Sequence, residues 1–296
     1  MQDYVSRYEW NAYRYPGQYI RLKQENWQKL HHLWSNPEEE PQQIETNQTL
    51  SAFEKWKSFI KRESVQEFVE EKDEGLPKTE DELKKYFLDK LFPFQLKWAS
   101  STLADVSFID KNIKNDNKLK YFLQRFPDTY LVLYYPVFSL KNVPIDGEII
   151  LISPIGIDII SVVDKQPTAK ILAGDERTWI TEVNEKQEKV LSPLIALKRT
   201  EQIVKRVLAT EGIDFPIKKL VLSRNNEIVF HTEPYNTKFI GKREYENWFA
   251  EKRKLVSPLK NRQLKALETL LKHCQTTSMK RPEWEEEQSF TMDNNP

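Results

Sequence analysis

The sequence has few of the residues that build disulfides, metal centres and phosphate-binding loops. Cys274 is its one cysteine, so no disulfide can form within the chain, and the four scattered histidines complete no ordinary zinc site. Only 7 of 296 residues are glycine, and neither a Walker motif nor a Gly-x-Gly-x-x-Gly motif occurs. No apolar run approaches roughly 18 residues, so we expect no membrane-spanning helix. The polar start of the chain opens no signal peptide, which predicts a cytoplasmic protein.

The chain also lacks an excess of either charge. Lys and Arg together number 45, as do Asp and Glu, so the formal net charge is zero. A balanced protein has no overall attraction to nucleic acid or to an anionic membrane, so any polyanion site must be a local patch. We therefore expect no membrane partner. The length predicts one large domain or two of ordinary size.

Residues 1–110 are rich in charged and aromatic residues and predict helices over 19–35, 48–71 and 79–101. The second of these has apolar residues at helical spacing, with charges between them. Such a stripe either packs against the rest of the protein, which is the commoner case, or binds a partner. Its members are Phe53, Trp56, Phe59, Ile60 and Phe68.

Residues 111–240 change character, with β-branched and aromatic runs between two predicted helices at 116–125 and 191–209. Ser192 and Pro193 are good start signals for the second helix. The order of helix, three or four strands, helix and returning strand predicts an α/β fold with a mixed sheet. The predicted strands are 129–138, 148–152, 157–163, 178–183, 219–222 and 228–231.

Two further helices, at 242–254 and 258–274, are predicted to close the folded part of the chain. The acidic tail from Met279 is predicted to be disordered. The expected organisation is a helical N-terminal region, an α/β domain, C-terminal helices and a tail, at 1–110, 111–240, 241–278 and 279–296.

The run from Pro144 to Val163 resembles the centre of the nuclease-related domain, the NERD family of the PD-(D/E)XK nuclease superfamily. That family shows an Asp at the start of a hydrophobic strand, a Pro-x-Gly turn, a second strand and then Glu-x-Lys. Here Ser153-Pro154-Ile155-Gly156 stands at the turn. The resemblance covers about 40% of the chain. It implies a restriction-endonuclease-like αβββαβ core with helical extensions at both ends.

The catalytic residues of that family are largely missing. Such nucleases hold Mg²⁺ on carboxylates, and a lysine assists the attacking water. The family's strand Asp corresponds to Glu148, but its Glu-x-Lys corresponds to Ser161 and Val163. Two further polar positions of the family fall near Asn117 and at Ala196. Because a serine is a poor metal ligand and a valine has no polar atom, the resemblance predicts a pseudo-nuclease with no metal site and no cofactor.

A rearranged nuclease site is the first alternative. Strand alternation puts Ser161 and Lys165 on one face and Asp164 on the other. A one-metal site using Mg²⁺ could be built from Glu148, Asp146 and Lys165. A solvated turn of charged residues accounts equally well for Asp164 and Lys165.

Nucleic-acid binding without cleavage is the second alternative. The helix predicted at 191–209 has basic residues opposite its apolar face, which is where phosphate contacts are made. A solvated helix face with the same residues is the commoner reading, and Glu201 dilutes the patch. The aromatic residues of the helix at 242–254 either stack on bases or pack on the core. The basic residues are Lys198, Arg199, Lys205 and Arg206.

The sequence therefore favours a non-catalytic NERD-like scaffold that contacts protein or nucleic acid. A metal-dependent nuclease and a nucleic-acid-binding module remain the alternatives. The arrangement of side chains around Glu148 distinguishes them best.

Overall fold

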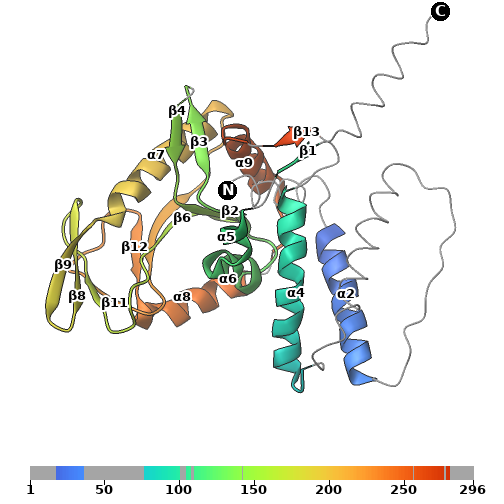
Figure 1. The fold of residues 1–296 in the computed structure, drawn as a ribbon. Coiled ribbons are helices and arrows are strands. Elements are labelled where there is room, and N and C mark those ends of the chain that lie inside the picture. The colour runs from blue at the N-terminus through green and yellow to red at the C-terminus, as the bar shows by residue number, and fades with distance from the viewer. Residues whose placement is uncertain are drawn as a thin grey trace, which may run out of the picture.

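The computed structural model has a central sheet with helices on both of its faces (Figure 1). Among the described residues, no helix is both long and apolar enough to cross a membrane. The helix predicted over 48–71 lies outside the described residues, as do both ends of the chain. The structure describes residues 18–36, 77–100, 105–107, 110–141, 143–255, 257–276 and 278–280.

The central sheet has five strands in the order β12-β10-β6-β5-β2. The pairs β2–β5 and β5–β6 are antiparallel, whereas β10 runs parallel to both β6 and β12. These directions confirm the α/β fold with a mixed sheet that the sequence predicts. The strands are β2 (Leu131–Leu133), β5 (Ile149–Ser153), β6 (Gly156–Val162), β10 (Ile217–Leu222) and β12 (Thr237–Ile240).

The turn between β5 and β6 is the one expected from the Pro-x-Gly pattern. The Ser153 hydroxyl accepts a hydrogen bond from the Gly156 N–H at 3.1 Å and donates one to the Gly156 carbonyl at 2.9 Å. A Cβ atom at Gly156 would lie 2.9 Å from the Pro216 carbonyl oxygen. Glycine is required here because the chain leading into β10 passes so close.

Helices cover both faces of this sheet, and the strand residues alternate between two cores. Strand residues such as Ile149 and Leu151 pack under α6 and α8, whereas Ile150 and Ile152 pack under α7 and α9. Ser192 caps α7 and Pro193 begins it, as the sequence predicts. The helices are α6 (Asn117–Arg125), α7 (Pro193–Thr210), α8 (Lys242–Lys254) and α9 (Asn261–Lys272).

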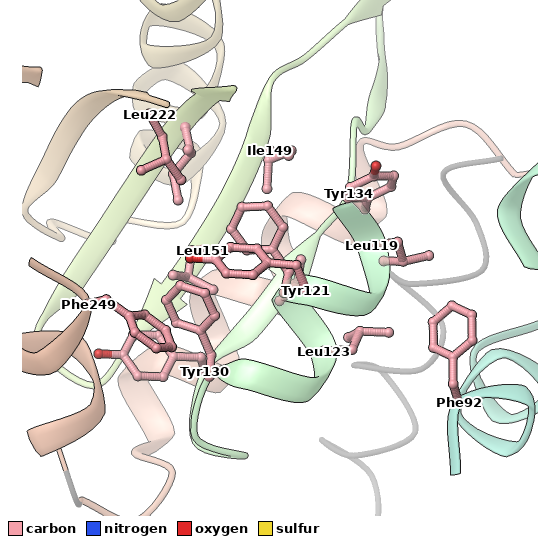
Figure 2. Close-up of a cluster of buried hydrophobic side chains, with 14 of the residues drawn as sticks. Phe92, Leu119, Tyr121, Leu123, Tyr130, Tyr134, Ile149, Leu151, Leu222 and Phe249 are labelled. Carbon is pink, nitrogen blue, oxygen red and sulfur yellow. The ribbon is translucent and has the colours of Figure 1, made fainter. Parts of the chain in front are cut away.

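The described N-terminal helices, α2 (Gln18–Ser35) and α4 (Glu80–Ser100), lie side by side next to α6 (Figure 1). The rings of Trp27 and Phe87 join them edge to face at 5.4 Å. Figure 2 shows Phe92 of α4 beside the α6 residues Leu119 and Leu123. The described part of residues 1–110 therefore shares a core with the α/β domain.

A second sheet of four strands, in the order β11-β7-β8-β9, packs on the α7 face of the central sheet. Two of its strands, β7 and β9, were not predicted. Strand β9 is almost fully exposed and rich in Lys, Gln and Glu, so it gives no hydrophobic alternation to detect. The strands are β7 (Lys170–Leu172), β8 (Thr178–Val183), β9 (Lys186–Leu191) and β11 (Glu227–Val229).

The predicted strand 129–138 is two strands. Strand β2 ends at Leu133, and the chain turns at Tyr135, whose φ of 49° lies in the left-handed region. Strand β3 (Val137–Leu140) then leaves the sheet and pairs with β4 (Val143–Asp146), which was not predicted. The turn residue Tyr135 and the following proline separate two runs that look continuous in sequence.

The remaining elements are short. Strand β1 (Asp105–Val106) pairs with β13 (Met279–Lys280), two residues that the sequence assigned to the tail. Helix α5 (Lys111–Lys114) precedes α6, and Asp110 caps it.

Candidate functional site

Glu148 and Ser161 meet at one edge of the central sheet. In the β5–β6 pair Ile149 lies opposite Ile160, so the next residues out, Glu148 and Ser161, also face each other. The Ser161 side chain lies near enough to lower the pKa of the Glu148 carboxyl in part. The structure therefore brings together the two positions that the resemblance implies for the site.

Helix α7 is fixed to this edge by a buried threonine. The Glu148 N–H donates to the Thr200 hydroxyl at 3.1 Å, and that hydroxyl donates to the Ala196 carbonyl at 2.9 Å. Thr200 is fully buried. It supplies a polar contact one helical turn after Ala196, whose own side chain offers none. No sequence pattern selects Thr200, because its role depends on how α7 packs.

The charge of Glu148 is balanced by groups from two helices. Burial raises the pKa of Glu148 above its ordinary value, and this effect prevails. The neighbouring Ser161 side chain and the positive charges of Arg199 and Lys118 lower the pKa in part. One carboxylate thus faces a hydroxyl and two cations, whereas a divalent ion needs several oxygen ligands.

Tyr135 connects this edge with α6. Its hydroxyl accepts a hydrogen bond from the Lys118 ammonium at 3.4 Å, and the ammonium lies 5.7 Å from the centre of the ring. Burial raises the pKa of Tyr135, and the negative charges of Glu148 and Asp116 raise it further. Tyr135 is therefore a neutral phenol at physiological pH. Its left-handed backbone was invisible in the sequence.

Asp116 caps the start of α6. One carboxylate oxygen accepts hydrogen bonds from the N–H groups of Lys118 at 2.8 Å and Leu119 at 3.2 Å. The other accepts a hydrogen bond from the Tyr134 hydroxyl at 2.7 Å. Both oxygens of this carboxylate thus have protein donors. Asn117, where the family has an acid, is simply the first residue of α6.

Asp164 lies two residues beyond the end of β6 and is paired with Arg224. It accepts hydrogen bonds from the backbone N–H of Arg224 at 2.9 Å and from its guanidinium at 3.1 Å. Lys165 is exposed, and its backbone N–H donates to the Asn226 side chain at 2.8 Å. These contacts close the end of β10 against the end of β6.

The acids near Glu148 do not group into a metal centre. Asp146 ends β4 opposite Val137 and is exposed, whereas Glu148 is half-buried. Across the described residues, no three His, Cys, Asp or Glu side chains are placed to hold a metal ion.

The four basic residues predicted on α7 differ in their surroundings and in the carboxylates near them. Lys198 forms an exposed ion pair with Glu176 at 3.2 Å. Lys205 lies 2.7 Å from Glu201. The positive charge of Arg199 lowers the pKa of Glu148 in part, and Arg206 is exposed. The four residues therefore do not form one uncompensated basic patch.

Glu201 is the centre of a buried ion-pair group on this face. It accepts hydrogen bonds from Lys205 and, at 2.5 Å, from Lys219 of β10. Burial raises the pKa of Glu201, but the two lysines outweigh burial and lower it overall. In the sequence Glu201 only reduces the positive charge of the predicted basic patch. In the structure it joins α7 to the sheet.

An open pocket of about 260 Å³ lies between the start of α7 and the starts of β10 and β12. Apolar side chains, including Leu194 and Ile195, form part of its wall. Its two lysines, Lys198 and Lys219, are the ones already paired with carboxylates. The pocket therefore presents little uncompensated charge to a ligand.

Comparison with known proteins identifies no relative of this chain. No protein-family model matches the chain, and no similar curated protein or solved structure was found.

Proposed function

We propose that this protein is a NERD-like pseudo-nuclease, a nuclease-type fold that contacts protein or nucleic acid without hydrolysing it. The order of elements supports this proposal: α6, then β2, β5 and β6 as an antiparallel set, then α7, then β10 parallel to β6. With the strands of the smaller sheets set aside, this order agrees with the helix, three strands, helix and strand of an αβββαβ core and so supports the proposal.

The pairing of Glu148 with Ser161 is the observation that carries the proposal. A working site of this class needs a second carboxylate opposite the first and a lysine two residues later. The residue two positions later is Val163, which packs against the core under α7. Lys118 and Arg199 add positive charge at Glu148 and so oppose a divalent cation.

Hydrolysis assays test the proposal directly. Single-stranded and double-stranded DNA and RNA are incubated with the protein and Mg²⁺ or Mn²⁺, beside Glu148→Ala as the matched control. We expect no turnover above that control. Cleavage by the natural protein that disappears in Glu148→Ala would overturn the proposal and favour a rearranged nuclease site.

A gain-of-function variant tests whether the register is correct. Ser161→Glu with Val163→Lys restores the acid and the ammonium on the face of Glu148. We expect this double variant to bind Mn²⁺ detectably by titration calorimetry, while Val163→Lys alone binds none. Equal Mn²⁺ binding by the natural protein would contradict the proposal.

A further inference from the structure

Helices α6 and α8 form a face whose rings are packed together on the opposite side of the sheet from α7. The hydroxyls of Tyr121 and Tyr245 join the two helices at 2.9 Å, and Tyr245 stacks on Phe249 with ring planes 7° apart. Figure 2 draws Tyr121 and Phe249 in one buried cluster with the strand residues Leu151 and Leu222. Neither Tyr121 nor Phe249 is more than 8% exposed. These rings are therefore a fixed floor rather than free side chains.

Three guanidinium groups lie over this floor. The Arg224 guanidinium is 4.6 Å from the centre of the Tyr121 ring. Those of Arg125 and Arg253 are 5.7 Å and 5.8 Å from the Phe249 ring. Each arginine interacts with the face of a ring, which restricts the guanidinium to a defined position.

Two of these arginines have no carboxylate partner in the part of the chain that the structure describes. Arg224 is paired with Asp164 at 3.1 Å, but Arg125 and Arg253 form no ion pair with any described residue. Their places in the last turns of α6 and α8 suit positive charge at the helix ends. A helix dipole compensates only a fraction of each charge, so the face remains basic in a protein of zero net charge.

We infer that the α6–α8 face binds the phosphate backbone of single-stranded nucleic acid through Arg125 and Arg253, with Arg224 held by Asp164 beside them. This inference rests on the proposed function and names the partner that the scaffold contacts. Guanidinium groups bind phosphate oxygens through paired hydrogen bonds, and their free planes stack on bases. From Tyr245 to Arg253 the helix rises about 12 Å, which gives a flexible strand several positions to contact.

Nucleic acid fits this face better than an acidic peptide. A carboxylate and a phosphate both accept paired hydrogen bonds from a guanidinium, but only a nucleotide also brings a base that stacks on the guanidinium plane. The tyrosine at the centre supports this arrangement, because burial raises the pKa of Tyr121 and keeps its hydroxyl neutral beside the arginines.

Fluorescence anisotropy with a labelled oligo(dT) or oligo(U) of about 20 nucleotides tests the inference. The protein is kept in EDTA, and salt is varied from about 50 to 200 mM. The double variant Arg125→Gln with Arg253→Gln should bind about tenfold more weakly at low salt. Its slope of log affinity against log salt should be shallower by about 1.4, or about 0.7 for each lost phosphate contact.

Matched variants separate this face from general charge effects. Arg206→Gln with Lys205→Gln removes the same charge from α7 and should leave affinity and slope unchanged. Arg125→Lys with Arg253→Lys keeps the charge and should retain most of the slope. No binding by the natural protein at low salt would overturn the inference, as would equal loss in the α7 variant. Displacement by poly-glutamate as efficient as that by unlabelled oligonucleotide would also overturn it.

The same samples distinguish failure of this inference from failure of the proposed function. Gels of the oligonucleotide after addition of Mn²⁺ record cleavage independently of binding. Cleavage would refute the pseudo-nuclease while leaving the binding face intact. Absence of both binding and cleavage would refute only the binding face.

Discussion

The two helical faces of the central sheet hold their positive charges in different ways. Under α7, lysines are paired with acids, as in the group formed by Glu201, Lys205 and Lys219. The α6–α8 face also has ion pairs, Lys252 with Asp158 and Arg224 with Asp164. Its Arg125 and Arg253 differ, because they lie over an aromatic ring and pair with no described carboxylate. An ion pair neutralises the charge of the side chain that it holds in place. A ring holds the guanidinium in place but leaves its N–H donors available for another ligand. The second face is therefore the one prepared for an external anion.

The largest effect should come from removing the ring that holds two of the arginines. Phe249 is 5% exposed, so Phe249→Ala should lower the free energy of unfolding by about 3–5 kcal/mol in urea denaturation. Arg253→Ala, which removes only the exposed cation, should cost about 0.5–1 kcal/mol. A cost below about 1 kcal/mol for Phe249→Ala would mean that the ring is not part of the core.

Breaking the buried ion pair on the α7 face should have the next largest effect. The side chains of Glu201 and Lys219 are only 9% and 12% exposed, so Glu201→Gln leaves a nearly buried ammonium with a weaker partner. We expect a loss of about 3 kcal/mol in urea denaturation. The double variant Glu201→Leu with Lys219→Met should recover most of this loss. If it is less stable than Glu201→Gln, the pair itself contributes more than its desolvation costs.

Glu148 should give a smaller effect that depends on pH. Because its folded pKa is raised above the ordinary 4.5, its contribution favours folding below pH 4.5 and is lost as pH rises through the folded value. Glu148→Gln should therefore be the more stable protein at neutral pH, and the advantage should shrink in acid. Thermal unfolding of both proteins, measured from pH 4 to pH 8 at intervals of about one pH unit, tests this difference. An advantage that grows in acid would contradict the assignment.

The smallest effect should come from the exposed pair of Lys198 and Glu176. Their side chains are 58% and 75% exposed. Glu176→Gln should change the free energy of unfolding by less than about 0.5 kcal/mol. A larger loss would show that exposed pairs on the α7 face also contribute to stability, which would weaken the contrast between the two faces.

The parts of the fold that follow from local patterns were predictable. Helix α8, predicted near 242–254, is found at Lys242–Lys254. The ends of β5 and β6 follow from the glycine of their turn. By contrast, β7 and β9 were missed, because exposed charged strands of a small sheet carry little hydrophobic signal.

The candidate site divides in the same way. The meeting of Glu148 with Ser161 follows from a tight hairpin, since a known turn sets the register. Thr200, Lys118 and Tyr135 could not be selected, because each reaches the site only through the packing of distant segments. The arginine-on-ring arrangement was missed for the same reason: Arg125 and Phe249 are 124 positions apart in the chain but adjacent in space.

The left-handed turn at Tyr135 also bears on how the molecule behaves in a crowded solution. It diverts the chain after three residues of β2, the outermost strand on that side of the sheet. An edge strand this short offers a neighbouring molecule few backbone groups with which to form an intermolecular sheet. The residue that helps to build the Glu148 edge thereby also protects the protein from edge-to-edge aggregation.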